Sequence, residues 1–171
     1  MARFVVRDFE RSDAAALTAM LHRSFAELGR SGLNFTAVDQ DEETTLRRTE
    51  GATTWLLMNG ETIAATATMR FPPEEELLEL CHASALPGRA WLNQLAVDPD
   101  YRGLGLASRM WALCRDWTRT VGATHIGLDT AAPAAHLVEL YSRWGFRHEE
   151  YIHWPGKTYD STIMVVPLDE D

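Results

Sequence analysis

The feature that most constrains the fold is an apolar strand that passes through two glycines directly into a helix. Residues 91–97 are predicted to form the strand and residues 104–121 the helix, with Gly103 and Gly105 at their junction. Glycine permits unusual backbone dihedrals and lets a ligand approach the chain closely. Unpaired N–H groups in front of a helix dipole attract anions. The segment therefore predicts an α/β unit with a site for a phosphate or pyrophosphate.

Glycines at a helix start also occur in ordinary turns, so the neighbouring residues decide the interpretation. Arg102 adds a fixed positive charge that can bond phosphate oxygens in pairs. The loop does not end in Gly-Lys-Ser/Thr, which excludes a nucleotide P-loop. It also lacks the third glycine of a dinucleotide-binding fingerprint.

Two motifs resemble the GNAT family of acyl-CoA N-acyltransferases. Residues 102–107, Arg-Gly-Leu-Gly-Leu-Ala, resemble the Arg/Gln-x-x-Gly-x-Gly/Ala loop that binds the coenzyme A pyrophosphate in that family. Residues 140–146, Leu-Tyr-Ser-Arg-Trp-Gly-Phe, resemble its Leu-Tyr-x-x-x-Gly-Phe segment. Gly145 also suits a helix C-terminus on conformational grounds alone. The resemblance covers roughly residues 91–168, and the order of elements extends it towards the N-terminus.

The resemblance implies a single-domain α/β fold, with residues 1–171 forming one N-acetyltransferase domain. The expected architecture is a mixed sheet of about seven strands, flanked by about four helices and splayed at the acetyl-CoA-binding strand. An Asn59-Gly60 hairpin joins two of the strands. The predicted strands are 3–9, 53–58, 63–70, 91–97, 124–130, 146–154 and 159–166, and the predicted helices begin near residues 12, 39, 104 and 133.

The resemblance also implies the residues that bind the donor. Backbone groups of Leu95 and Val97 would pair with the pantetheine arm, and the Leu95 N–H would polarise the thioester carbonyl. Tyr141 is the expected general acid, because an ordinary phenol pKa of ~10 allows it to protonate the leaving thiolate. The expected cofactor-binding residues are Leu95, Ala96, Val97, Arg102, Gly103, Leu104, Gly105, Leu106, Ala107 and Ser108.

The general base is less evident from the sequence. Many relatives carry a carboxylate or histidine where this chain has Asn93, which cannot accept a proton but can orient a relay water. Glu79, His82 and His153 qualify by chemistry, although each is also an ordinary surface residue type. A second departure is Ala134, where relatives often have an asparagine that contacts the cofactor.

The acceptor pocket of such a fold is expected between the first two helices, their connecting loop and the last hairpin. Aromatic and titratable residues there would suit a cationic amine, while simple packing explains each of them equally well. The expected substrate residues are Phe25, Phe35, Trp91 and His153, with Trp154 in the same region.

Composition limits the partners. The net charge of −9 argues against nucleic acid and is compatible with a cationic substrate. No apolar run approaches the ~20 residues that span a bilayer, and the charged N-terminal residues do not resemble a signal peptide. Cys81 and Cys114 are not expected to form a disulfide, and no metal is expected. The predicted location is the cytoplasm, and a homodimer is left open.

The predicted function is acetyl transfer from acetyl-CoA to a primary amine of a small molecule or peptide. Two alternatives stay open at this point. One is an acyl-CoA-binding sensor without catalysis, which the amide at Asn93 favours and Tyr141 opposes. The other is an acetyltransferase for protein lysines or N-termini, which an exposed groove would favour over a closed aromatic pocket.

Overall fold

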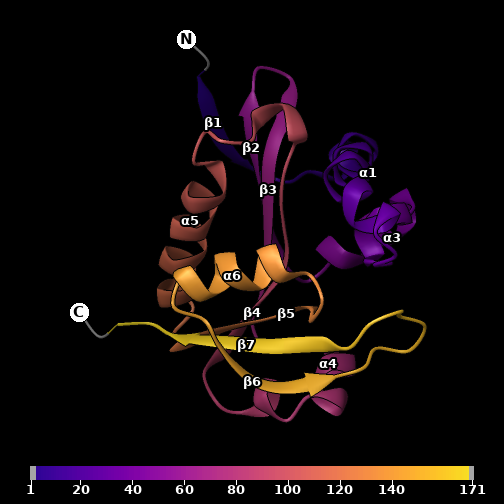
Figure 1. Ribbon diagram of the computed structural model, residues 1–171. Coiled ribbons are helices and arrows are strands. Elements are labelled where there is room, and N and C mark those ends of the chain that lie inside the picture. The colour runs from indigo at the N-terminus through magenta and orange to yellow at the C-terminus, as the bar shows by residue number, and fades with distance from the viewer. Residues whose placement is uncertain (1–2, 170–171) are drawn as a thin grey trace.

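A seven-stranded mixed sheet forms the centre of the molecule, in the order β1-β2-β3-β4-β5-β7-β6 (Figure 1). The structure, a computed structural model, describes residues 3–169, so the two ends of the predicted domain at 1–2 and 170–171 lie outside the described residues. The seven predicted strands are confirmed. They are β1 Phe4–Asp8, β2 Thr53–Asn59, β3 Thr62–Arg70, β4 Arg89–Val97, β5 His125–Ala131, β6 Arg147–Ile152 and β7 Ser161–Pro167.

Four longer helices match the prediction, and two short ones add to it. The long helices are α1 Ala14–Arg30, α3 Glu42–Thr49, α5 Leu106–Thr120 and α6 Ala135–Arg143. The short helices, α2 Thr36–Asp39 and α4 Glu75–Leu80, lie in segments expected to be irregular. Neither is long enough to show an apolar period in the sequence, although Glu75 and Glu76 suit the positive end of α4.

The β2–β3 hairpin turns at the predicted Asn59-Gly60. Gly60 has a φ of 61°, which favours glycine, and the two strands pair antiparallel on either side of it. β3 then pairs antiparallel with β4, with a shift of register between Thr68 and Met69. Because Thr68 faces Gln94 and Met69 faces Leu92, Asn93 is the extra residue of a β-bulge.

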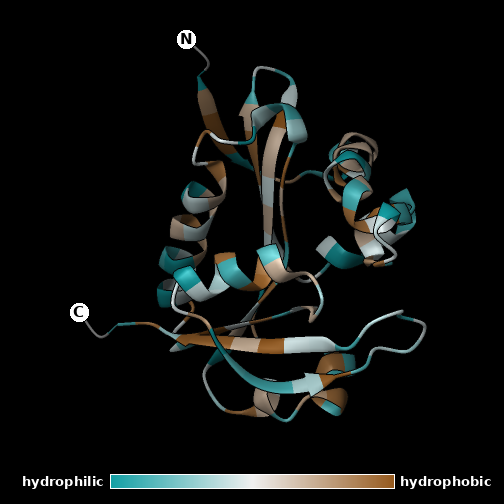
Figure 2. Cartoon of the chain, in the orientation of Figure 1, coloured by the Kyte–Doolittle hydropathy of each residue, from teal (hydrophilic) through white to brown (hydrophobic). Residues whose placement is uncertain are grey.

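Two apolar layers hold the sheet between helices. On one face α5 and α6 bury Met110, Cys114 and Tyr141 against β2 to β5. On the other face α1 buries Leu17 and Leu21 against β2, β3 and β4. In Figure 2 β1 and much of β7 are brown, whereas β6 is mostly teal and the helices carry both colours. Both cysteines are buried and free.

The sheet splays between β4 and β5, as predicted. These parallel strands pair only from Arg89 to Trp91 on β4, opposite His125 to Gly127 on β5. The Trp91 ring packs directly on Gly127, where an added Cβ would lie 2.0 Å from the indole. Beyond that contact the strands separate. In Figure 1 β2 and β3 run upright, whereas β7 and β6 run across the lower part of the molecule.

Candidate functional site

The glycine loop presents a row of free backbone donors. Gly103 and Gly105 have φ angles of 79° and 74°, and Gly105 is the residue before α5. Among residues 3–169, no acceptor bonds the N–H groups of residues 103–108. These groups converge at the positive end of a 15-residue helix. An anion would find several unpaired donors at this helix start.

The side chains of this loop differ in their surroundings. The Arg102 guanidinium donates from Nη2 to the Ser24 carbonyl on α1, at 3.0 Å, and lies at the edge of the cavity described below. Leu104 is 58% exposed and does not line that cavity. Its expected contribution to the cofactor site is thus restricted to its backbone N–H.

The splay leaves one edge of β4 open. The Asp98 N–H donates to the Ala64 carbonyl of β3 at 2.9 Å, and direction alternates along an antiparallel strand. The N–H groups of Leu95 and Val97 therefore point away from β3, into the gap opposite β5. The Val97 carbonyl already accepts a hydrogen bond from the Ser24 hydroxyl at 3.1 Å, so its N–H is the group left for a ligand.

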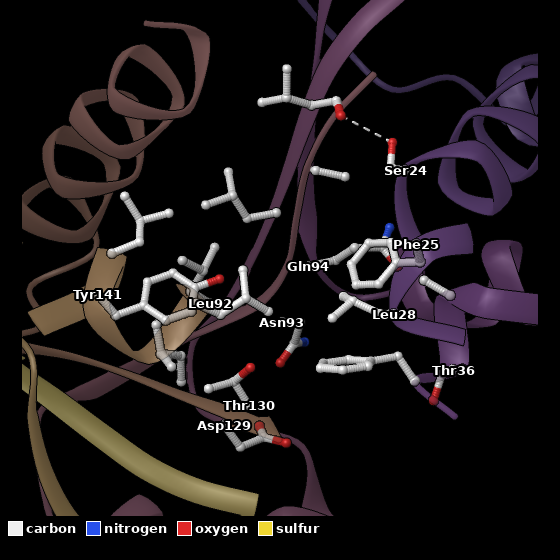
Figure 3. A pocket seen from close by; sticks show the side chains of 18 of the residues that line it. Ser24, Phe25, Leu28, Thr36, Leu92, Asn93, Gln94, Asp129, Thr130 and Tyr141 are labelled. Atoms are coloured by element: carbon white, nitrogen blue, oxygen red, sulfur yellow. Dashed lines mark hydrogen bonds between the residues drawn. The ribbon is translucent and has the colours of Figure 1, made fainter. Parts of the chain in front are cut away.

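Tyr141 lies on α6 at the side of this gap. Its ring packs edge-on against Trp144 and Phe146, and Figure 3 shows its hydroxyl directed into the pocket. No acceptor among residues 3–169 takes its proton. Burial, with the charge of Asp129 adding to it, raises the pKa of Tyr141 to about 12. The phenol is thus held as a proton donor.

The β4 bulge carries Asn93 into the same space. Its side-chain amide, drawn in Figure 3, points into the pocket and has no hydrogen-bond partner within the described part of the chain. Its backbone carbonyl accepts from Nη2 of Arg48 at 3.1 Å. A bulge changes the direction of one side chain relative to the strand. Here it leaves the Asn93 amide able to bind a water or a substrate.

One cavity of about 1070 Å³ joins these parts. It runs from the glycine loop along the open edge of β4, past Tyr141, to the first helices and the β6–β7 loop. Of the expected residues, those that line it are Phe25, Phe35, Asn93, Leu95, Ala96, Val97, Arg102, Gly103, Gly105, Leu106, Ala107, Ser108 and Tyr141.

Two expected substrate residues lie elsewhere. Trp91 is fully buried between Gly127 and the α4 core, because its ring fills the space that this glycine leaves. His153 is exposed and binds Asp160, with Nδ1 and Oδ1 2.9 Å apart. Neither residue lines the cavity, so the expectation that they contact substrate is corrected. Two base candidates, Glu79 and His82, are exposed and also lie outside it.

An aromatic group walls the far end of the cavity. The rings of Phe25 and Phe35 are 5.5 Å apart between centroids, and those of Phe35 and Tyr159 are 5.3 Å apart. All three residues line the cavity, and Leu28 lies beside them. This end offers an apolar surface to part of a ligand.

A set of hydrogen bonds joins two loops beside this end. We call residues 32–36 and 156–158 the strap, because they bond to each other. Lys157 Nζ donates to the Asn34 carbonyl at 2.8 Å and to Thr36 Oγ1 at 3.0 Å. Asn34 in turn bonds Gly156 and Thr158, through Nδ2 at 3.0 Å and Oδ1 at 2.9 Å respectively. The strap thus fixes the β6–β7 loop against the segment after α1.

Sequence reasoning missed two charged side chains in the cavity. Arg48 lies in the last turn of α3, where a basic residue also suits the helix dipole. Asp129 lies within β5, where its neighbours Leu128 and Thr130 are buried. A carboxylate inside such a strand was the available signal, since it needs a partner when buried. Glu74 also lines the cavity, and partial desolvation raises its pKa.

Two further searches concern metals and membranes. Within residues 3–169, no group of three or more His, Cys, Asp or Glu side chains could hold a metal ion. Over the same range, no helix is long and apolar enough to cross a membrane.

One protein family matches most of the chain. The model of the acetyltransferase (GNAT) family matches residues 17–146. The search of curated proteins gave no match.

Solved structures share the fold at low identity. The ribosomal-protein-S18-alanine N-acetyltransferase of Escherichia coli has a TM-score of 0.72 and 20% identity, over 99% of this chain and 96% of that one. A GNAT acetyltransferase of Listeria monocytogenes has a TM-score of 0.75 and 18% identity, over 98% of both chains. The structure of yncA from Salmonella typhimurium holds its cofactor acetyl-CoA. It has a TM-score of 0.67 and 16% identity, over 98% of this chain and 95% of that one.

Proposed function

Because the chain belongs to the acetyltransferase (GNAT) family, we propose that it transfers the acetyl group of acetyl-CoA to the primary amine of a small molecule. One observation carries the proposal. A single cavity joins the free N–H groups of the glycine loop, the open edge of β4, the Tyr141 hydroxyl and the aromatic far end. The proposed N-acetyltransferase domain comprises the whole chain, residues 1–171.

Acetyl-CoA supplies an activated acetyl group, and the N–H groups of residues 103–108 with Arg102 would bind its pyrophosphate. Acetyl-CoA is also the co-substrate of the Salmonella relative. The Leu95 N–H would hold the thioester oxygen while the amine nitrogen forms its bond to the carbonyl carbon. Leu95 and Val97 would position the pantetheine arm through their free backbone edge.

Tyr141 and Asn93 would take part in the proton transfers to the thiolate and from the amine. When the carbon–sulfur bond breaks, the Tyr141 hydroxyl donates to the leaving sulfur, and its raised pKa keeps it protonated for that step. Asn93, which lines the cavity, would hold a water that carries the amine's proton away. Full ionisation of this phenol is costly, so its contribution is chiefly a hydrogen bond that strengthens as charge develops on sulfur.

The strap and the aromatic far end favour a small acceptor over a protein. The strap joins two loops beside the far end, where a protein lysine or N-terminus would need an open groove. The E. coli relative acts on a ribosomal protein's alanine, so the family as a whole includes protein acceptors.

The test is thiol release from acetyl-CoA with a panel of small amines and short peptides, followed by mass spectrometry of the products. We expect acetylated small amines and little product from peptides. Tight coenzyme A binding with no product from any acceptor would identify an acyl-CoA sensor instead. Product from peptides alone would identify a protein acetyltransferase.

A further inference from the structure

Two tryptophans hold the Asp129 carboxylate in a fixed orientation in the cavity. Trp91 Nε1 donates to Oδ1 at 3.0 Å, and Trp154 Nε1 donates to Oδ2 at 2.9 Å. Each oxygen keeps a lone pair for a ligand. Within residues 3–169 no cation forms an ion pair with this carboxylate. Asp129 is thus a rigid anion whose charge has not been neutralised.

Arg48 is the matching cation in the same cavity. Its Nη1 donates to Gln40 Oε1 at 2.9 Å and to Gln94 Oε1 at 2.7 Å, and Nη2 donates to the Asn93 carbonyl at 3.1 Å. All three acceptors are neutral. In the described residues its Nε–H has no partner, and no carboxylate pairs with it. The guanidinium is thus fixed in place with its charge and part of its donor set unused.

Opposite charges that line one cavity normally collapse into an ion pair, because isolated buried charges are costly. Here each charge is tied to neutral partners, which keeps Asp129 and Arg48 apart. Such a pair is complementary to a molecule whose own cation and anion lie close together. Each protein charge then gains its missing partner from the ligand.

We propose that the acceptor is a zwitterion of the amino-acid type, whose ammonium binds Asp129 and whose carboxylate binds Arg48. The inference rests on the proposed function. Thr130, the next residue, supports it, because its buried hydroxyl has no hydrogen-bond partner within residues 3–169 and, in Figure 3, lies at the pocket wall. A ligand oxygen or nitrogen would satisfy that hydroxyl.

The remaining surroundings define the rest of the acceptor. The Phe25, Phe35 and Tyr159 rings face the cavity and suit an apolar or aromatic side chain. Lys157 also lines it, but its ammonium is used by the strap. The cavity lining holds five further charged residues, which are exposed: Glu27, Arg47, Glu74, Glu76 and Arg102.

The reaction itself changes this recognition. The ammonium loses one proton, its nitrogen bonds to the acetyl carbon and then loses a second proton, and the carbon–sulfur bond breaks to release a thiolate that takes up one proton. The product is a neutral amide that still carries its carboxylate. Asp129 loses its cationic partner on acetylation, so the product should bind less tightly than the substrate.

The experiment compares acceptors that share one side chain. Phenylalanine, its amide and phenethylamine differ only in the carboxylate, and a leucine series repeats the comparison. We expect kcat/KM to favour the amino acids by ~10- to 100-fold, as for one charge-assisted interaction. Equal or better turnover of the decarboxylated amines would overturn the inference while leaving the proposed function intact.

Variants of Arg48 test whether this residue causes the preference for amino acids over amines without a carboxylate. Arg48→Gln should remove most of the ratio between phenylalanine and phenethylamine, whereas Arg143→Gln, at an exposed arginine that does not line the cavity, should preserve it. A ratio that survives Arg48→Gln in a folded protein contradicts the assignment. If that variant does not fold, Arg48→Lys replaces it, because it keeps the charge but loses the planar fork.

Direct binding separates this inference from the proposed function. Calorimetry on the coenzyme A-saturated wild-type protein should detect phenylalanine, and N-acetylphenylalanine should bind more weakly. Binding of phenylalanine without turnover would support the zwitterion site and reject catalysis. Absence of phenylalanine and leucine binding, with simple amines still acetylated, would reject the zwitterion site alone.

Discussion

The two ends of the cavity are built from different parts of the chain. The donor end uses backbone groups of one continuous segment, residues 95–108. The acceptor end uses side chains brought together from α1, α3 and β5, among them Phe25, Arg48 and Asp129. Backbone N–H groups persist through most substitutions, whereas each acceptor side chain can change by itself. One fold can therefore keep its donor and change its acceptor.

The largest effect is expected at the donor end, from Gly105→Asp. The φ of 74° disfavours any residue with a Cβ, and a carboxylate at this helix start repels the pyrophosphate. Acetyl-CoA binding measured by calorimetry should be abolished while circular dichroism stays native. Gly60→Asp is the matched control, because Gly60 has a φ of 61°, equally open space and a place in a distant hairpin. Unchanged affinity in folded Gly105→Asp would refute the pyrophosphate assignment.

Tyr141→Phe tests the chemistry between the two ends. It removes one hydroxyl and keeps the ring that packs on Trp144 and Phe146. The turnover number should fall by ~10²–10⁴, with coenzyme A affinity unchanged. Steady-state kinetics and calorimetry measure the two quantities separately. A wild-type turnover number would reduce Tyr141 to a packing role.

Gly127→Ala tests the contact where the two ends meet. An added Cβ would lie 2.0 Å from the Trp91 ring, so the indole that holds Asp129 must move. We expect a loss of ~1–3 kcal/mol in unfolding free energy from overpacking, together with a higher KM for the acceptor. Urea denaturation and kinetics measure these effects. Gly122→Ala, at a site with open space but a φ of 78°, controls for backbone strain alone.

The smallest effect is expected from Asn93→Ala, which should lower the rate less than ~10-fold by releasing the relay water.

In the wild type, kcat/KM should rise as pH approaches the pKa of each amine. It should not fall before about pH 10, because burial keeps Tyr141 protonated until its pKa of about 12. Glu79→Gln, outside the cavity, should leave this profile unchanged. One fixed pKa for amines of different basicity would instead reveal a protein base, with Glu74 the first candidate.

The same contrast explains what sequence reasoning could predict. The order of the strands along the chain and the splay follow from local patterns and from the family motif, and the structure confirms both. Gly103 and Gly105 were recognisable because their function depends on their own φ angles. Leu104, within the same motif, turns its side chain to solvent, which a local pattern does not specify.

The acceptor end could not be predicted in this way. Arg48 enters the cavity only because α3 packs beside the β4 bulge, 45 residues further along the chain. Trp91 was expected to contact substrate, yet Gly127 on a neighbouring strand draws its ring into the core. Contacts of this range depend on tertiary packing. The sequence therefore predicted the aromatic character of the pocket from Phe25 and Phe35, but not its charges.

Arg48 also belongs to both ends at once, since it bonds the Asn93 carbonyl of the donor strand while it faces the acceptor pocket. A movement of β4 as acetyl-CoA binds would be transmitted to this guanidinium through one hydrogen bond. The two ligands are then thermodynamically linked. By whatever factor the donor changes the affinity for the acceptor, the acceptor must change the affinity for the donor by the same factor.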